Sequence, residues 1–213
     1  DGMNEVALRT DAPVPAVLLG SRTESCGLDY IVLDDYHAAF LVVSRLASCH
    51  HRRIAFLSYP DAQGYSALDR MNGFRKAVKR QGESQFEISI RTLPSEQLAV
   101  SCAETAKLLA LPERPTAIVA QNDYIAYGAL QAVSEAGLAV GRDVAVIGFD
   151  DLEYSWLSKI SLSSVGCEGP NLAARGFALM QRRLLEQGRA GRCGILLAPR
   201  LVFRRSFSGE PVC

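Results

Sequence analysis

Groups of polar side chains follow four short apolar runs in this sequence, in positions where they could bind a small polar molecule. They are Ser21, Ser66 with Arg70, Asn122 with Asp123, and Asp150 with Asp151. In folds built on parallel strands, ligands bind beyond the carboxyl ends of the strands and near helix N-termini. We therefore expect a binding site for a polar ligand rather than a site for bond-breaking chemistry.

The residue types suit the recognition of hydroxyl groups. Arg70 offers a planar set of fixed donors for paired hydroxyls or a carboxylate. Asp150 can accept two hydrogen bonds from adjacent hydroxyls, and Asn122 offers both a donor and an acceptor. Phe149 or Tyr65 could pack on the apolar face of a sugar or a base. If Arg70 and Asp150 lie solvated in an open cleft, the ligand-free protein should tolerate their replacement by alanine.

Structural roles compete with these assignments. Ser66 with Asp69 three residues later forms a capping-box pattern, so Ser66 could instead start a helix. Arg70 could be a surface ion-pair partner. Asp123 is better explained as a helix N-terminal residue that binds free backbone donors. Asp151 is expected to be solvated or structural.

No pattern in the sequence predicts an enzyme, a cofactor or a metal ion. The glycine-rich phosphate-binding and nucleophile-elbow motifs are absent from it. The histidines His37, His50 and His51 fall on one expected helix or at its end, away from the aspartates that follow strands. Cys49 with His50 and His51 could be read as metal ligands, but adjacent side chains point poorly at one ion. We expect no catalytic residues, no cofactor and no metal site.

Alternating strands and helices must position these side chains. Short apolar runs rich in β-branched residues alternate with segments of helical period. The strands are expected at 16–19, 54–57, 87–91, 117–120 and 144–149, with a final apolar stretch at 195–203. The helices are expected at 36–48, 67–81, 96–109, 123–136 and 172–187. This order predicts an α/β fold with a mostly parallel sheet covered on both faces.

Composition narrows the function classes. Of 213 residues, 48% are hydrophobic and 22% are charged, as in ordinary globular proteins. Lys plus Arg equals Asp plus Glu at 23 each, so the chain has no general attraction to nucleic acid or to an anionic membrane. No apolar run approaches the roughly 20 residues of a membrane helix. The six scattered cysteines, without a CxxC pair, predict reduced thiols and a cytoplasmic location.

Several segments, in order along nearly the whole chain, resemble the LacI/GalR family of bacterial transcriptional repressors. The segments are 14–20 (VPAVLLG), 52–57 (RRIAFL), 70–74 (RMNGF), 114–123 (RPTAIVAQND), 135–138 (EAGL), 143–151 (DVAVIGFDD) and 201–206 (LVFRRS). Two departures are minor: His50 stands where the family often has glycine, and the family's proline near Ser161 is absent.

The resemblance implies a core similar to the type I periplasmic sugar-binding proteins. Such a core has two doubly wound parallel-sheet subdomains, joined by three crossover strands, with a ligand cleft between them. Here the N-terminal subdomain would be incomplete and comprise 1–33 and 166–194, and the C-terminal subdomain would comprise 34–165 and 195–213. The abrupt start at Asp1 agrees with a truncated N-terminus, and the DNA-binding headpiece would be absent.

The resemblance also implies a function. It places ligand contacts at Ser66, Arg70, Asn122 and Asp150. The expected role is the effector-binding and dimerisation part of a regulator that binds a small polar ligand, with a sugar as the leading class. The partners would be a second copy of the chain and DNA, the latter only through the headpiece. The alternative is the solute-binding protein of a sugar transporter, and the cysteines and the closing segment 201–206 favour the regulator.

Overall fold

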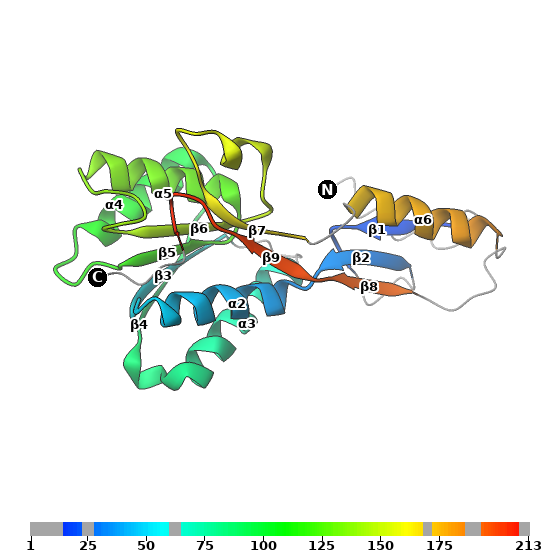
Figure 1. Cartoon of the computed structure of the whole chain (residues 1–213), viewed down its shortest axis with the longest axis horizontal. Helices are drawn as coiled ribbons and strands as arrows, with labels where there is room; N and C mark the ends of the chain where they lie inside the picture. The colour runs from blue at the N-terminus through cyan, green and yellow to red at the C-terminus, as the bar shows by residue number, and fades with distance from the viewer. Residues whose placement is uncertain (1–14, 23–27, 60–64, 168–171, 186–192, 209–213) are drawn as a thin grey trace. The chain divides into compact units, whose positions relative to one another are not determined.

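The computed structural model describes residues 15–22, 28–59, 65–167, 172–185 and 193–208 and divides into two compact units. Unit 1 comprises 1–34 and 167–198, and unit 2 comprises 35–166 and 199–213. The chain therefore passes between the units three times (Figure 1). Among the described residues, none of the helices has the length and apolar character that a membrane span requires.

Unit 2 contains a six-stranded sheet in the order β4-β3-β5-β6-β7-β9. Its strands are β3 (Arg53–Ser58), β4 (Glu87–Thr92), β5 (Ala117–Ala120), β6 (Ala145–Phe149), β7 (Ser163–Cys167) and β9 (Pro199–Val202). The pairs from β4 to β7 are parallel. Every residue of β5 and β6 is buried, which explains why these strands are continuous apolar runs.

Helices cover both faces of this sheet (Figure 1). They are α2 (Asp35–Ser48), α3 (Tyr65–Gly82), α4 (Leu98–Leu109) and α5 (Asp123–Glu135), with the short 3-10 helices η1 (Glu83–Gln85) and η2 (Glu153–Trp156). Side chains alternate between the faces of β3. Phe56 contacts Phe74 of α3 with ring centroids 5.0 Å apart, whereas Leu57 joins the apolar cluster that contains Ile125 of α5.

Gly73 allows α2 and α3 to pack closely. A Cβ atom at this position would lie 2.1 Å from the backbone oxygen of Tyr36 in α2. We expect Gly73→Ala to lower the free energy of unfolding by about 1–3 kcal/mol, because the two helices must separate. The matched control is Asn72→Ala, an exposed neighbour on α3, which should change it by about 0.5 kcal/mol or less. Urea unfolding measures both, and equal stabilities would contradict the close approach.

Unit 1 contains a parallel three-stranded sheet in the order β1-β2-β8 and one helix. The elements are β1 (Val17–Leu19), β2 (Asp29–Leu33), β8 (Gly194–Leu197) and α6 (Leu172–Leu185). The core of the unit joins Ile31, Leu179 and Leu197. Arg183 is buried and donates from Nη2 to Asp29 Oδ1 at 2.7 Å. This buried ion pair links α6 to the start of β2.

Three expectations about these elements need correction. Strand β2 has no counterpart among the predicted strands. The apolar stretch 195–203 is not one strand, because β8 pairs with β2 in unit 1 and β9 lies beside β7 in unit 2. The boundaries of the units therefore differ from those expected for the subdomains: residues 34 and 195–198 belong to unit 1, and residue 166 belongs to unit 2. The predicted end of the last helix, at 186–187, lies outside the described residues.

Candidate functional site

Arg70 is the centre of a polar cluster at the carboxyl end of the unit 2 sheet. Its side chain projects from α3 and is only 7% exposed. Nε donates to Asp35 Oδ1 at 2.6 Å, and Nη2 donates to Asp150 Oδ1 at 3.1 Å. Nη1 donates to the backbone oxygen of Gln121. The start of α2 and the loops after β5 and β6 thus hold the guanidinium in one orientation.

The ring of Phe149 packs against the guanidinium of Arg70. The last residue of β6 is fully buried, and the Arg70 guanidinium carbon lies 4.5 Å from its ring centroid. This contact is a cation–π interaction, which adds to the fixed orientation of the guanidinium. The expectation that Phe149 packs on a ligand is therefore corrected, because its ring has no surface left for one.

Asp35 is the buried partner that the sequence did not reveal. It is the first residue of α2, and its carboxylate accepts from Arg70 and from the Ser66 hydroxyl. Burial raises the pKa of Asp35 above its usual range, although the charge of Arg70 and the Ser66 hydrogen bond oppose this shift. Ser66 lies inside the first turn of α3, which begins at Tyr65, so its hydroxyl orients Asp35 from there.

Asp150 presents the most accessible charge of the cluster. Its side chain is 41% exposed, and it follows β6 with a φ of 97°, in the left-handed region. Its backbone nitrogen donates to the oxygen of Val165 at 2.9 Å. Such a conformation costs about 1–3 kcal/mol in a residue with a side chain and is concentrated at functional sites. The strained backbone places one carboxylate beside Arg70 and at the surface.

Asn122 follows β5, the neighbour of β6, and caps α5. Its Oδ1 accepts from Ile125 N at 2.9 Å, and its Nδ2 donates to Glu96 Oε2 at 3.1 Å. The sequence predicted that Asp123 is the helix N-terminal residue, and Asp123 does begin α5. The cap bond, however, is made by Asn122, and the backbone donor bound by Asp123 is Leu152 N, outside the helix. Asn122 is therefore partly engaged in holding its own helix.

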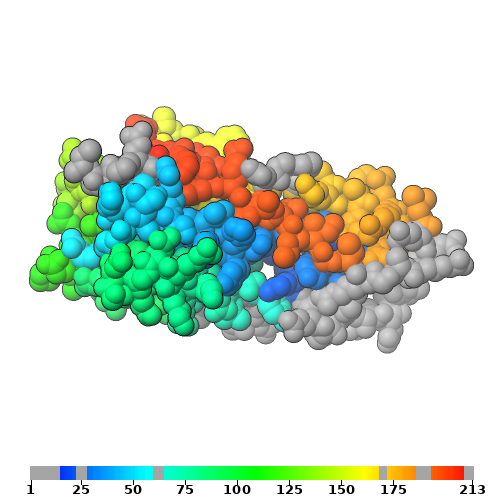
Figure 2. All heavy atoms as spheres, turned by 60° about the horizontal axis from the view of Figure 1, so that its bottom comes forward, coloured from blue at the N-terminus to red at the C-terminus, as the bar shows by residue number. Residues whose placement is uncertain are grey.

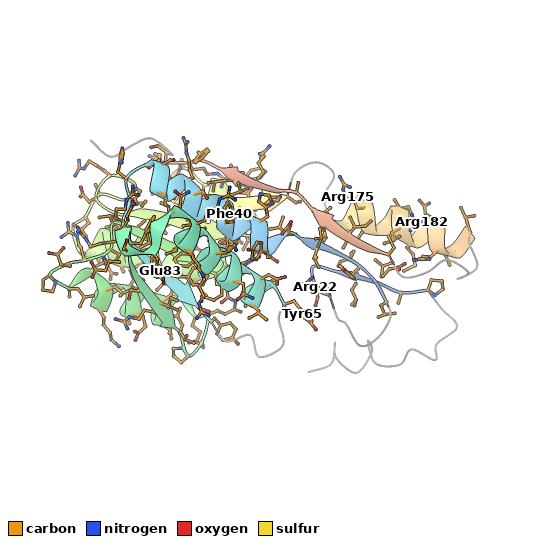
Figure 3. All side chains as sticks on the ribbon, turned by 90° about the horizontal axis from the view of Figure 1, so that it is seen from below. Arg22, Phe40, Tyr65, Glu83, Arg175 and Arg182 are labelled. Atoms are coloured by element: carbon orange, nitrogen blue, oxygen red, sulfur yellow. The ribbon has the colours of Figure 1, made fainter. Side chains whose placement is uncertain are left out.

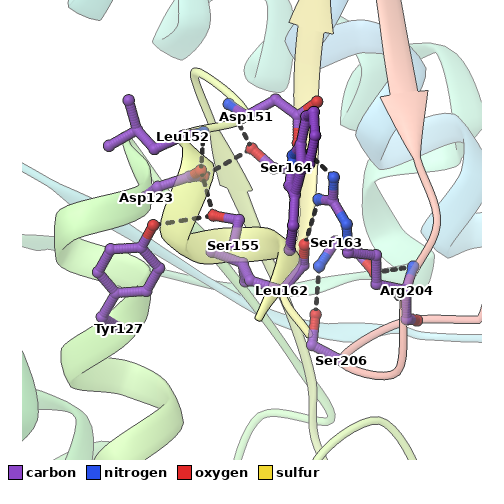
Figure 4. Close-up of polar contacts among 11 residues, drawn as sticks. Asp123, Tyr127, Asp151, Leu152, Ser155, Leu162, Ser163, Ser164, Arg204 and Ser206 are labelled. Atoms are coloured by element: carbon purple, nitrogen blue, oxygen red, sulfur yellow. Dashed lines mark hydrogen bonds and ion pairs between the residues drawn. The ribbon is translucent and has the colours of Figure 1, made fainter. Parts of the chain in front are cut away.

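Asp123 anchors the loop that follows Asp150 (Figure 4). The carboxylate is fully buried. Oδ2 accepts from Ser155 Oγ at 2.6 Å and from Leu152 N at 2.9 Å, and Oδ1 accepts from Ser164 Oγ at 2.6 Å. Tyr127 Oη lies 2.9 Å from Ser155 Oγ and extends the network. One carboxylate therefore joins α5, η2 and β7.

Asp151 has the structural role that the sequence allowed for it. Its Oδ1 accepts from Arg204 Nη2 at 2.7 Å and from Trp156 Nε1 at 3.2 Å. Arg204 also donates to the backbone oxygen of Leu162 at 2.6 Å. This ion pair holds the loop after β6 to the segment that follows β9, next to the Asp123 network (Figure 4).

The buried carboxylate of Asp123 makes stability depend on pH. Burial raises its pKa to about 6 against the hydrogen bonds that it accepts. A carboxyl whose folded pKa exceeds its unfolded value stabilises the protein at low pH. This contribution to the free energy of unfolding is lost as pH rises, here between about 4 and 6. The free energy of unfolding of the wild type minus that of Asp123→Asn should therefore fall by roughly 2 kcal/mol from pH 4.5 to 6.5.

The comparison with Asp123→Asn removes an opposing contribution from His51. Burial lowers the pKa of His51 to about 4, so its contribution is lost as pH falls from about 6.5 through 4. Since His51 is present in both proteins, its effect cancels in the difference. Urea unfolding at each pH supplies the measurement, and a difference that does not change with pH would refute the raised pKa.

The two remaining predicted residues, Tyr65 and Ser21, belong to different units. Tyr65 is half-buried at the start of α3 (Figure 3), and Ser21 is exposed after β1 in unit 1. The structure brings together Ser66, Arg70 and Asp150, and Arg70 contacts the residue before Asn122. Within the described ranges, no three His, Cys, Asp or Glu side chains are grouped as a metal site.

Comparison with known proteins points to one group. The model of a family of periplasmic binding protein-like domains matches residues 43–207. The arabinose metabolism transcriptional repressor of Geobacillus stearothermophilus is 29% identical over 203 residues, which cover 91% of this chain and 53% of that protein. The HTH-type transcriptional repressor PurR of Mannheimia succiniciproducens is 29% identical over 204 residues, which cover 93% and 59%. The chain thus spans little more than half the length of these relatives.

A solved structure extends the similarity to the fold. The crystal structure of a LacI transcriptional regulator from a Rhodococcus species aligns with a TM-score of 0.81 and 26% sequence identity. The alignment covers 99% of this chain and 74% of that one, so both units have counterparts in it.

Proposed function

Because the chain belongs to the family of periplasmic binding protein-like domains, as part of the effector-binding core of a LacI-type transcriptional regulator, we propose that it binds a small polar effector. Sugars are the leading class of ligand. Binding would alter how the whole regulator binds DNA, which is a coupling between two distinct sites.

The Arg70–Asp150 pair is the observation that carries this proposal. Arg70 uses three of its five N–H donors in the bonds to Asp35, Gln121 and Asp150 found among the described residues. The exposed carboxylate of Asp150, fixed beside the buried guanidinium, would serve as a preoriented acceptor, with the remaining donors of Arg70 next to it. Adjacent hydroxyl groups, which both donate and accept, match this set, and little side-chain entropy would be lost on binding.

Tyr65, Ser66 and Asn122, all of unit 2, complete the proposed site. Ser66 orients Asp35 and through it Arg70, and the Asn122 side chain retains acceptor capacity beyond its cap bond. Tyr65, half-buried at the start of α3, supplies an aromatic face in place of Phe149. Ser21 remains a prediction from the sequence alone.

The regulator would act as a cytoplasmic homodimer without catalytic activity. Two-fold pairing matches palindromic operators. The described cysteines Cys49, Cys102, Cys167 and Cys193 are free thiols, which agrees with a reducing compartment. We assign DNA contact to a part of the regulator beyond these 213 residues, because the chain carries equal numbers of positive and negative side chains.

A thermal-shift panel tests the proposal. The chain is heated with aldopentoses, aldohexoses or purine bases, each in large excess. A bound ligand at about 100 times its Kd adds about 2.7 kcal/mol of stability and should raise Tm by about 5 °C or more. A shift with sugars supports the leading class, whereas a shift with purine bases alone would replace it. A panel without any shift would count against effector binding by this chain.

A further inference from the structure

A groove of about 430 Å³ lies between α3 and β4, on unit 2. Phe74 and Val78 of α3 form one apolar wall, and Phe86, Ile88 and Ile90 form the other. Ile88 and Ile90 alternate along β4 and therefore point to the same face of the sheet, and Phe86 directly precedes the strand with an extended backbone. In Figure 2, the atoms of α3 and β4, coloured cyan to green, face the viewer. Phe74 and Val78 are buried at the base of the groove, and the apolar surface that remains accessible belongs to the half-buried Phe86, Ile88 and Ile90.

The groove runs along the open edge of a sheet. β4 is the end strand, and in the described part of the chain it pairs only with β3. Glu87 N donates to Arg52 O at 2.9 Å, and Leu93 N donates to Ser58 O at 2.7 Å. Because alternate residues of a parallel strand bond to opposite sides, the amides of Ile88 and Ile90 point away from β3. The edge therefore offers hydrogen-bonding groups beside an apolar wall.

The rim of the groove is cationic. Arg75 and Lys79 line it from successive turns of α3. Glu83 of η1, labelled in Figure 3, is an acidic residue of the same lining. All three side chains are exposed. Arg52 adds a further positive charge, with its guanidinium carbon 5.2 Å from the Phe86 ring centroid. The charge of the rim favours an anionic occupant.

We propose that this groove binds an extended, acidic segment of a partner protein, which adds as a strand to β4. Main-chain groups of the segment would bond to the outward amides of Ile88 and Ile90. Its apolar side chains, at every second position, would enter the space beside Phe74 and Val78, and its carboxylates would pair with Arg75 and Lys79. Strand addition beside a helix is a known mode of peptide recognition, in which main-chain bonds give affinity and side-chain pockets give specificity.

The probe is a short fluorescein-labelled peptide with isoleucine or valine at alternate positions and glutamate between them. Fluorescence anisotropy with the full chain should show saturable binding that weakens with salt. Lys79→Glu should weaken binding about 10-fold, because it replaces an attraction by a repulsion. The matched control is Lys76→Glu, which is exposed on the same helix but outside the groove and should change affinity about twofold or less.

A pair of N-methylated peptides separates strand addition from a simple charge or apolar contact. N-methylation of alternate amides removes the donors along one edge of the peptide and leaves its side chains and charge unchanged. The peptide methylated on the edge that faces β4 should lose binding, and the peptide methylated on the other edge should retain it. Equal binding of both peptides would overturn the proposal, as would an equal effect of the two lysine variants or no binding at millimolar peptide.

Discussion

Replacing Arg70 by methionine is expected to lower the free energy of unfolding by about 3–5 kcal/mol, even without ligand. The substitution leaves the buried carboxylate of Asp35 without its cation, and a buried unpaired charge is costly. It also removes the group that lies on Phe149. Urea unfolding of the ligand-free chain measures the loss. The matched control is Arg75→Met, an exposed arginine of the same helix, for which we expect about 0.5 kcal/mol or less.

A double variant distinguishes the unpaired charge from lost packing. If the charge of Asp35 is the cause, Asp35→Leu combined with Arg70→Met should recover much of the stability, because an apolar pair can replace a buried ion pair at little cost. A small loss in Arg70→Met, close to that of Arg75→Met, would contradict the burial of the pair.

This outcome reverses an expectation drawn from the sequence. The sequence indicates that Arg70 follows a strand and its loop, and from this we expected a solvated side chain that a ligand-free protein can lose. The burial of Arg70 depends on Asp35, which is distant in the sequence and belongs to another helix. Nothing in the local pattern around Asp35 distinguishes it from an ordinary acidic residue in a first helical turn.

The strands and helices of unit 2 could be predicted because local patterns dominate there. β5 and β6 are buried on both faces and so consist of apolar residues alone. α5 begins after Asn122 and ends before Gly137, which has a φ of 70° and is a typical helix stop. In these elements, propensity, pattern and tertiary packing agree.

The elements of unit 1 were harder to predict, because tertiary pairing overrides local patterns. β2 begins with Asp29, a residue that disfavours strands, and this aspartate is stabilised by Arg183 of α6. The same ion pair explains the burial of Arg183, which the local sequence does not indicate. Two adjacent arginines near a helix end resemble a surface, and only the position of Asp29 makes one of them buried.

The hydrogen-bond network of Asp123 is only weakly indicated by the sequence, through two serines of β7. Ser163 and Ser164 occupy an otherwise apolar strand, and buried hydroxyls require partners. Ser164 binds Asp123, and Ser163 Oγ donates to the backbone oxygen of Phe207 at 2.9 Å. The serines predict buried hydrogen bonds at β7, but their partners can be found only from the fold.

Asp150→Asn is expected to weaken ligand binding by about 1.5–3 kcal/mol, or roughly 10- to 150-fold, for the sugar or base that the thermal-shift panel identifies. The substitution keeps the shape of the side chain but removes its charge. The Asp150 carboxylate is 41% exposed, and Arg70 keeps its ion pair with Asp35. We therefore expect the free energy of unfolding to change by about 1 kcal/mol or less. Glu153→Gln, an exposed acidic residue of η2, is the matched control and should leave affinity unchanged.

Calorimetric titration of the wild type and Asp150→Asn with that ligand tests the central claim most directly. A loss of affinity within the expected range, with nearly unchanged urea unfolding and a normal Glu153→Gln control, is the result that the Arg70–Asp150 site predicts. Equal affinities of the wild type and Asp150→Asn would show that the effector binds elsewhere.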